Sequence, residues 1–290
     1  MVNQRRLKIM LETQFPARPK MEVFAKWLMF TCCILFLGFM AAYYPVEANI
    51  PFIVIPSILV LLFAKPVFFE KLKLTTLLVM RIVIVFAFFF IEMRQIYVDL
   101  ILLALIINIL EATFTDLLKH KKYFNAISGF MLAAGVVGLR GGWVEGAGYY
   151  LVGGPNQIAT ICYVIGYTIW NWIFVTDEFS PAVSLMHIGF LGAPILGGLV
   201  SMAFGNAANP MGIWLLLRAN TLAIGGWLQI ACKGWFEREF YDEKFAKFIE
   251  FTHKNSVQFV LMLINVGLMI AVIAIAATTP GFIGSPAFER

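Results

Sequence analysis

The sequence predicts an all-α protein, a polytopic transmembrane helical bundle of about nine spans, with a cytoplasmic N-terminus and the C-terminus outside. Three observations lead to this prediction: a very apolar composition, repeated apolar runs of spanning length, and basic residues concentrated in alternate loops. Of the 290 residues, 61% are hydrophobic and 13% are charged, whereas a soluble domain has about 45–50% apolar and about 25% charged residues. A water-soluble fold of this length cannot hide so much apolar surface, so lipid must surround much of the chain.

The apolar runs come close to the roughly 20 residues that a spanning helix needs. We expect spans at 23–44, 50–66, 74–93, 97–117, 123–138, 158–176, 181–203, 211–232 and 256–277. The run 123–138 is the shortest of them. Together the spans leave no room for a second folded domain. We therefore expect a basic cytoplasmic segment (1–22) followed by a single transmembrane domain (23–290).

The distribution of basic residues sets the orientation, because cytoplasmic loops are enriched in Lys and Arg. With the N-terminus inside, most of the 22 basic residues fall on the cytoplasmic side. These are Arg5, Arg6, Lys8, Arg18, Lys20, Lys26, Lys65, Lys71, Lys73, Lys119, Lys121, Lys122, Lys233, Arg238, Lys244, Lys247 and Lys254. Arg94, Arg140 and Arg290 lie outside. The inner turn 176–180 carries no basic residue, so if that hairpin does not cross, the prediction becomes seven spans with the same ends.

Charge and hydropathy together predict an integral membrane protein, expected in the plasma (inner) membrane. The basic start precedes an apolar run of full length with no small-residue cleavage site, which favours a signal anchor over a cleaved signal peptide. The net charge of +5 follows from the cytoplasmic loops, so no nucleic-acid partner is expected. The expected partners are the lipid bilayer and a small solute, and a homo-oligomer stays open.

Two segments between the spans are distinctive. The outer loop 141–157, GGWVEGAGYYLVGGPNQ, is rich in glycine and aromatic residues. It is either an aromatic belt with flexible joints or a lid over a cavity. The inner segment 233–254 has aromatic residues at helical spacing and a supporting Glu243–Lys247 pair, which predicts an amphipathic helix on the inner leaflet. Its role is structural, or it docks a partner.

Charged residues inside the membrane are costly, so each one is a functional hypothesis. Arg81 lies eight residues after Lys73, and Glu111 lies eight residues before Lys119. The helical rise therefore puts both about 12 Å from the inner flanking lysines. Because their spans are antiparallel neighbours, we predict a salt bridge between Arg81 and Glu111, either structural or part of a mechanism.

Further polar residues fall at a similar depth on other spans. Asn108 and Glu111 share one face of the span 97–117, with Asp116 on an adjoining face. Tyr167 and Asn171 share one face of the span 158–176, and His187 reaches a similar height. A common layer of Arg81, Glu111, Asn171 and His187 predicts a site where the helices converge. The candidate binding residues are Arg81, Asn108, Glu111, Asp116, Tyr167, Asn171, His187 and Arg218.

Arg218 lies about 10 Å above that layer by the same helical rise. We expect it to pair with Glu145 or Glu92, to snorkel outward, or, unpaired, to form an anion site. The span 181–203 carries several glycines and Pro194, which predicts close helix packing or, alternatively, a hinge.

The sequence lacks the motifs of the common catalytic and cofactor sites. It has no P-loop, no nucleophile elbow and no His/Cys spacing that fits zinc, so no metal, no cofactor and no catalytic residue is expected. No predicted span has an interior lysine, which would exclude a retinal Schiff base. The four cysteines, Cys32, Cys33, Cys162 and Cys232, fall in apolar runs and are expected to pack as small apolar side chains.

Three functions fit these observations. The first is a multi-pass transporter or channel for a small polar or ionic solute, with Glu111 as the proton- or cation-coupling carboxylate, Arg81 as its counter-ion, and Asn171 and His187 as solute ligands. The second is a membrane-embedded enzyme that acts on a lipid or lipophilic substrate, using His187 with Glu111 or Asp116 for acid–base chemistry. The third is a non-catalytic membrane subunit anchored through its inner Phe-rich helix.

Overall fold

A computed structural model of the chain describes residues 20–64, 66, 68–140, 143–144, 149–150, 156–203 and 210–279. Within these ranges the protein is helical, apart from a two-residue antiparallel ladder in which β1 (Trp143–Val144) pairs with β2 (Tyr149–Tyr150). The all-α prediction is therefore confirmed for the part of the chain that is described. Most of the basic segment 1–22 and of the outer loop 141–157 lies outside the described residues.

The helical elements follow one another with short connections. In chain order they are α2 (Lys20–Tyr43), η1 (Ile50–Val54), α3 (Ile55–Phe63), α4 (Phe68–Phe89), η2 (Ile91–Met93), α5 (Arg94–Thr115), η3 (Asp116–His120), α6 (Tyr123–Gly135), η4 (Val136–Leu139), α7 (Gln157–Glu178), α8 (Pro181–Ala203), η5 (Pro210–Ile213), α9 (Trp214–Ala231), α10 (Lys233–Glu239), α11 (Glu243–Thr252) and α12 (Asn255–Thr278).

Among the described residues, 7 helices are long and apolar enough to cross a membrane: α2, α4, α5 with η3, α7, α8, α9 and α12. The hairpin without basic residues consists of two of them, α7 and α8. The shorter apolar helices are instead Ile50–Phe63 and Tyr123–Leu139. The crossing of these two, and the placement of the N-terminus in the cytoplasm, stay predictions. Following the predicted orientation, we call the end of the bundle with His120 and Lys233 the inner end, and the opposite end the outer end.

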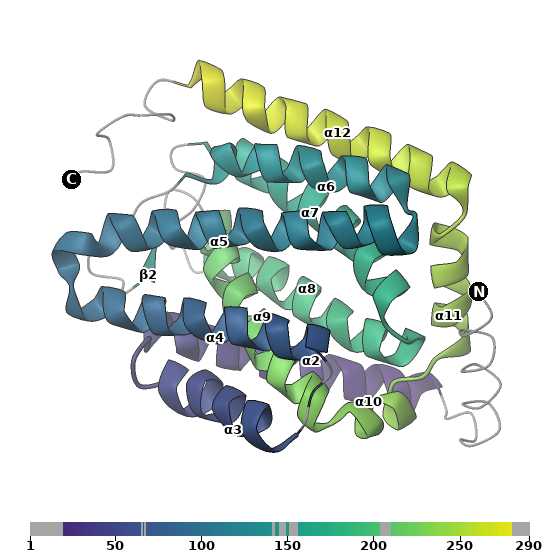
Figure 1. Cartoon of the computed structure of the whole chain (residues 1–290), viewed down its shortest axis with the longest axis horizontal. Coiled ribbons are helices and arrows are strands. Elements are labelled where there is room, and N and C mark those ends of the chain that lie inside the picture. Colours follow the sequence, from purple (N-terminus) through teal and green to yellow (C-terminus); the bar gives the residue numbers. More distant parts are fainter. Residues whose placement is uncertain are drawn as a thin grey trace.

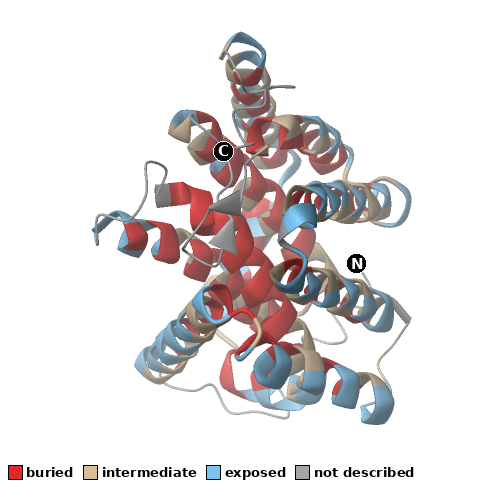
Figure 2. Ribbon diagram, turned by 90° about the vertical axis from the view of Figure 1, so that its left-hand side faces the viewer, coloured by how far each residue is buried: buried red, intermediate tan, exposed pale blue. Residues whose placement is uncertain are grey.

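Helix α9 forms the centre of the bundle. Of its most apolar stretch 83% is buried, compared with 22% for α2 and for α12. Figure 2 shows the same gradient, with buried residues at the middle of the bundle and exposed residues around the periphery. Helices α2, α4 and α8 pack against α9, whereas α12 packs against α6 and α7, and α5 runs between α4 and α6 (Figure 1). A polar side chain on α9 therefore faces protein on most sides.

Glycines let α8 approach its neighbours closely, as the small-residue pattern predicts. A Cβ on Gly197 would overlap the side chain of Leu217 on α9, and a Cβ on Gly189 would lie 2.9 Å from Thr31 on α2. Pro194 lies inside α8, which continues through it as one helix. These contacts support the close-packing interpretation of the glycines of α8.

The predicted amphipathic helix 233–254 is wrong in two respects. It is two helices, α10 and α11, separated at Phe240–Asp242, with the Asp242 side chain accepting a hydrogen bond from the backbone of Phe245 to start α11. Phe236 and Phe240 are buried, and both rings contact Phe30 of α2. The apolar face of α10 therefore covers the inner end of the bundle instead of facing lipid. The predicted Glu243–Lys247 pair is present on α11.

Candidate functional site

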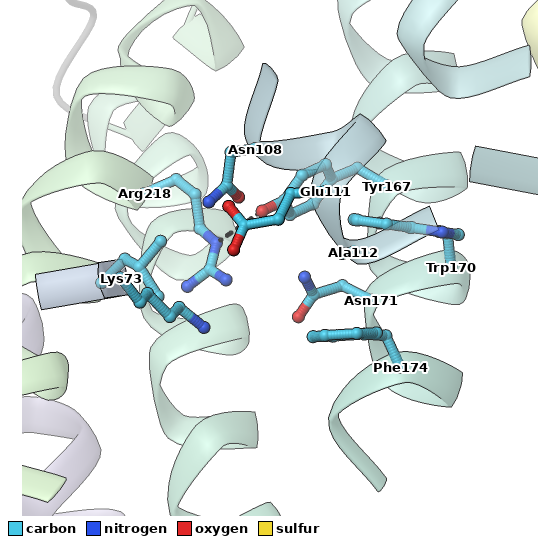
Figure 3. A pocket seen from close by; sticks show the side chains of 10 residues that line it. Lys73, Asn108, Glu111, Ala112, Tyr167, Trp170, Asn171, Phe174 and Arg218 are labelled. Carbon is cyan, nitrogen blue, oxygen red and sulfur yellow. Dashed lines mark hydrogen bonds between the residues drawn. The ribbon is translucent and has the colours of Figure 1, made fainter. Parts of the chain in front are cut away.

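A small polar cavity lies inside the bundle where α4, α5, α7 and α9 meet (Figure 3). Its lining residues are Lys73, Asn108, Glu111, Ala112, Tyr167, Trp170, Asn171, Phe174, Arg218 and Leu222. The cavity has a volume of about 20 Å³, which is enough for roughly one water molecule. It contains five of the eight predicted candidate residues: Asn108, Glu111, Tyr167, Asn171 and Arg218.

Helical periodicity explains how α5 and α7 supply their residues. Asn108 and Glu111 are three residues apart and share one face of α5, as predicted. Tyr167, Asn171 and Phe174 follow the i, i+4, i+7 spacing on α7, and all three are buried. Because a polar stripe is costly against acyl chains, both faces turn toward each other and toward α9.

Several polar groups in the cavity have unmet hydrogen-bonding capacity. Among the described residues, the side chains of Lys73, Asn108, Glu111 and Asn171 make no hydrogen bond and no ion pair with protein. Asn171 is only 7% exposed, and its Oδ1 atom is buried without a partner. A buried polar group without a hydrogen bond costs about 1–3 kcal/mol. Native proteins normally satisfy such groups with water or a ligand.

Arg218 contributes a buried cation to the same cavity and is 3% exposed. Its Nε donates to the Tyr167 hydroxyl at 3.4 Å, its Nη1 donates to the carbonyl oxygen of Phe190 at 3.4 Å, and the guanidinium lies 5.6 Å from the Tyr167 ring centre. Its Nη2 has no hydrogen-bond partner among the described residues. One edge of the guanidinium is therefore held by protein, while the other is left for a ligand.

Of the surroundings expected for Arg218, the separate layer above Glu111 is wrong. Arg218 shares the cavity with Glu111 instead of lying a separate layer above it. Glu92 is exposed on η2, away from the cavity, and Glu145 lies outside the described residues. Both side chains are long, so they line one cavity although their Cα atoms differ in depth. Helical rise alone does not include this reach.

Lys73 also lines the cavity, although the sequence interpretation placed it in the inner flank of a span. It lies within the apolar stretch Glu70–Phe89, with its ammonium group 6.0 Å from the ring centre of Phe179. The expectation that no span has an interior lysine is therefore wrong, and the exclusion of a Schiff base that rested on it falls as well. A lysine two residues after Lys71, close to the start of the apolar run, gave no sequence signal that it lines a cavity.

The predicted Arg81–Glu111 salt bridge does not form. Arg81 is 1% exposed and donates to the Oδ1 atoms of Asn220 and, at 3.4 Å, of Asn49. The sequence analysis measured the depth of Arg81 from Lys73, which it placed in the inner membrane flank. In the structure Lys73 lies at the level of Glu111, so Arg81, eight residues later on α4, lies about 12 Å nearer the outer end. Arg81 belongs to the buried face of α4 that packs on α9, and it is separate from the cavity.

His187 lies in a second cavity of about 20 Å³, which shares Lys73 and Leu222 with the first. Its ring stacks on Phe179 with 4.6 Å between ring centres, and its Nε2 lies 2.6 Å from Oε1 of Gln229. The hydrogen bond occupies Nε2 of His187. The residue forms part of the wall on the inner side of the polar cavity. The predicted common layer therefore holds for Glu111 and Asn171, but not for Arg81 or His187.

Aromatic rings close the polar cavity toward both ends. On the outer side the Tyr167 ring meets Trp214 edge-on at 5.2 Å, and Trp214 also contacts Tyr163 at 6.3 Å. On the inner side the Phe174 ring faces His120, with 6.3 Å between ring centres. The rings narrow the cavity toward both ends, while Lys73, Asn108 and Glu111 at its side are only partly buried.

Asp116 lies outside the cavity, below Phe174, in what we call the inner charged cluster. The cluster consists of Asp116, Lys119, His120, Lys122, Asp177, Glu178 and His253. The His120 ring nitrogens lie 3.2 Å from Asp116, 3.2 Å from Asp177 and 2.8 Å from Glu178. These contacts join η3 to the end of α7 directly beneath the cavity.

His253 ties the start of α12 into the same cluster. Its Nδ1 lies 3.1 Å from the ammonium of Lys122 and 3.6 Å from Asp177, and its Nε2 lies 2.8 Å from the hydroxyl of Thr176. Burial, and then the positive charge of Lys122, lower the pKa of His253 from 6.5 to about 4. His253 is therefore neutral at pH 7, with Lys122 as the donor to Nδ1.

Sequence reasoning missed this cluster because its histidines are far apart in the chain. One signal was present: the inner turn after α7 carries Asp177 and Glu178 but no basic residue, while 119–122 reads KHKK. Complementary charges on neighbouring inner turns predict ion pairing. Among the described residues, no group of three or more His, Cys, Asp or Glu side chains could hold a metal ion.

Comparison of the chain with protein-family models, with curated proteins and with solved structures found no match.

Proposed function

We propose that this protein is a transporter for a small polar or ionic solute, which binds in the polar cavity between α4, α5, α7 and α9. One observation carries the proposal. Lys73, Asn108, Glu111 and Asn171 turn hydrogen-bonding groups toward a common space without bonding to protein. In an apolar bundle such groups are costly unless a bound molecule satisfies them.

The aromatic rings on both sides of the cavity favour a transporter that alternates between states, and they speak against a permanently open channel. A transporter must pass through a state in which its site reaches neither side, and binding near the middle of the bundle is typical of such proteins. The Tyr167–Trp214 contact would open toward the outer end, and Phe174 with the inner charged cluster would open toward the inner end. Glu111 remains the coupling carboxylate, with Arg218 and Lys73 taking the counter-ion role expected of Arg81.

The two alternative functions have less support. The acid–base pair proposed for a lipid enzyme is not assembled, because His187 contacts Gln229 whereas Asp116 contacts His120. In the segment expected to dock a partner, Phe236 and Phe240 pack within the bundle, and only Trp235, Phe248 and Phe251 are exposed large apolar residues.

Uptake into proteoliposomes tests the proposal. The purified protein is reconstituted and supplied with radiolabelled glycerol, glycine, choline or pyruvate, which represent neutral, zwitterionic, cationic and anionic solutes. At least one of them should enter faster than into empty liposomes, and Asn171→Leu should remove most of that difference. Asn255→Leu makes the same chemical change on an exposed part of α12 and should leave uptake intact. Uptake equal to that of empty liposomes for all four solutes, or full uptake by Asn171→Leu, would overturn the proposal.

A further inference from the structure

We infer that the solute is a small monocarboxylate anion, and that a proton enters with it on Glu111. This inference rests on the proposed transport function and names its substrate class. It is carried by the charge balance of the cavity, by the unused edge of Arg218 and by the position of Glu111 beside both.

The charge balance of the cavity favours an anion. Two cationic side chains, Lys73 and Arg218, line it together with one carboxylate, Glu111. A net positive charge enclosed by apolar helices is costly. A bound anion pairs with these two cations, whereas a bound cation is repelled by them. A neutral solute leaves the imbalance as it is.

The geometry of the donors favours a carboxylate over a simple ion. The two oxygens of a carboxylate can accept from two separate donors, one on Arg218 and one on Asn171. In Arg218, Tyr167 and the Phe190 carbonyl hold Nε and Nη1, which leaves Nη2 toward the cavity. Figure 3 shows Asn171 on the opposite wall, where its amide can donate to the second oxygen.

The remaining walls limit the rest of the solute. Trp170 and Phe174 stack with 6.1 Å between their ring centres and present an apolar wall, and Ala112 and Leu222 are apolar as well. Polar groups at one side and apolar side chains at the other are typical of sites for small amphipathic ligands. A carboxylate with a short apolar tail fits this division better than a polyol does.

The position of Glu111 couples the anion to a proton. Lys73, Arg218 and Glu111 give the empty cavity one positive charge, and the loaded cavity keeps that same charge only if a proton accompanies the anion. When the anion binds beside Glu111, a proton from the same side therefore joins the Glu111 carboxylate. The occluded complex carries one added anion and one added proton, so no net charge crosses. On the other side the anion dissociates, and Glu111 releases its proton.

The experiment follows radiolabelled pyruvate into proteoliposomes with and without a proton gradient. With an acidic exterior one pH unit below the interior, wild-type protein should accumulate pyruvate up to about tenfold, as expected for one proton per anion. A pH-sensitive dye inside the liposomes should report acidification that follows pyruvate uptake. Clamping the membrane potential with valinomycin and potassium should leave the rate unchanged, because the transported complex adds no charge.

Glu111→Gln keeps the size of the side chain and a carbonyl acceptor but replaces the carboxylate that takes up the proton by a neutral amide. The variant should still exchange internal for external pyruvate, while the gradient no longer drives accumulation. Glu92→Gln, the same change on an exposed residue of η2, should behave as wild type. Thermal unfolding of both variants in detergent verifies that each is folded.

The outcomes separate this inference from the proposed function. Uptake of glycine, choline or glycerol but not of pyruvate would refute the monocarboxylate and leave transport standing. Failure of all four solutes would refute both. Gradient-driven accumulation of pyruvate by Glu111→Gln would refute the role of Glu111 as proton carrier.

Discussion

Removal of the Lys73 charge should weaken binding of a monocarboxylate much more than it affects folding. Lys73→Met keeps an unbranched side chain of similar length and removes the ammonium group. Because Lys73 makes no hydrogen bond or ion pair among the described residues, its loss leaves no protein group without a partner. The midpoint of thermal unfolding should therefore stay equal or rise.

The expected loss of affinity follows from Coulomb's law. Two unit charges about 5 Å apart interact by roughly 3 kcal/mol at an effective dielectric constant of about 20. Water in the cavity lowers this value, so we expect a loss of about 1.5–3 kcal/mol, or about tenfold to a hundredfold in the dissociation constant. Binding of a neutral solute should change little, and binding of a cation should improve.

Titration of the purified protein with pyruvate, followed by the fluorescence of its tryptophans, measures the dissociation constant. Lys71→Met is the matched control, since Lys71 lies two residues earlier on the same helix and is exposed. Equal dissociation constants for Lys73→Met and wild type, or an equal loss in Lys71→Met, would refute the electrostatic reasoning.

Three further predictions concern the bundle around the cavity. Gly225→Ala should lower the unfolding midpoint, at a cost of about 1–3 kcal/mol, because the new Cβ overlaps a phenylalanine ring of α8; Gly192→Ala, with nothing within 4 Å, should not. Asn220→Ala should destabilise by about 1–3 kcal/mol, since buried Arg81 loses an acceptor; an unchanged denaturation midpoint contradicts this. Because the pKa of His253 is lowered to about 4, the unfolded chain binds this proton first on acidification, so stability should fall between pH 6.5 and 4. His253→Gln should flatten the unfolding profile in that window, and an identical profile argues against it.

Periodicity predicted the parts of the site that depend on one helix. The shared faces of Asn108 with Glu111 and of Tyr167 with Asn171 follow from the helical repeat, because a polar stripe on a spanning helix must avoid lipid. The close contacts of the α8 glycines followed in the same way from their small size. The helical fold itself follows from composition and run length.

Relations between helices were predicted less well, because they depend on depth and rotation. A shift of one reference residue, Lys73, from the membrane flank to the cavity moved Arg81 out of the expected layer by about 12 Å. The inner charged cluster joins His120 to Asp177 and His253 over long separations in the chain. Pairings of this kind are set by the tertiary packing, which the local pattern does not contain.

The central claim is that unsatisfied polar side chains of four helices surround a space that a solute occupies. A cryo-electron microscopy map of the protein in lipid nanodiscs, recorded with and without pyruvate, tests it. The account predicts density between Arg218, Asn171 and Glu111 that changes when pyruvate is added. A map in which these three side chains bond to one another and leave no space between them would contradict it.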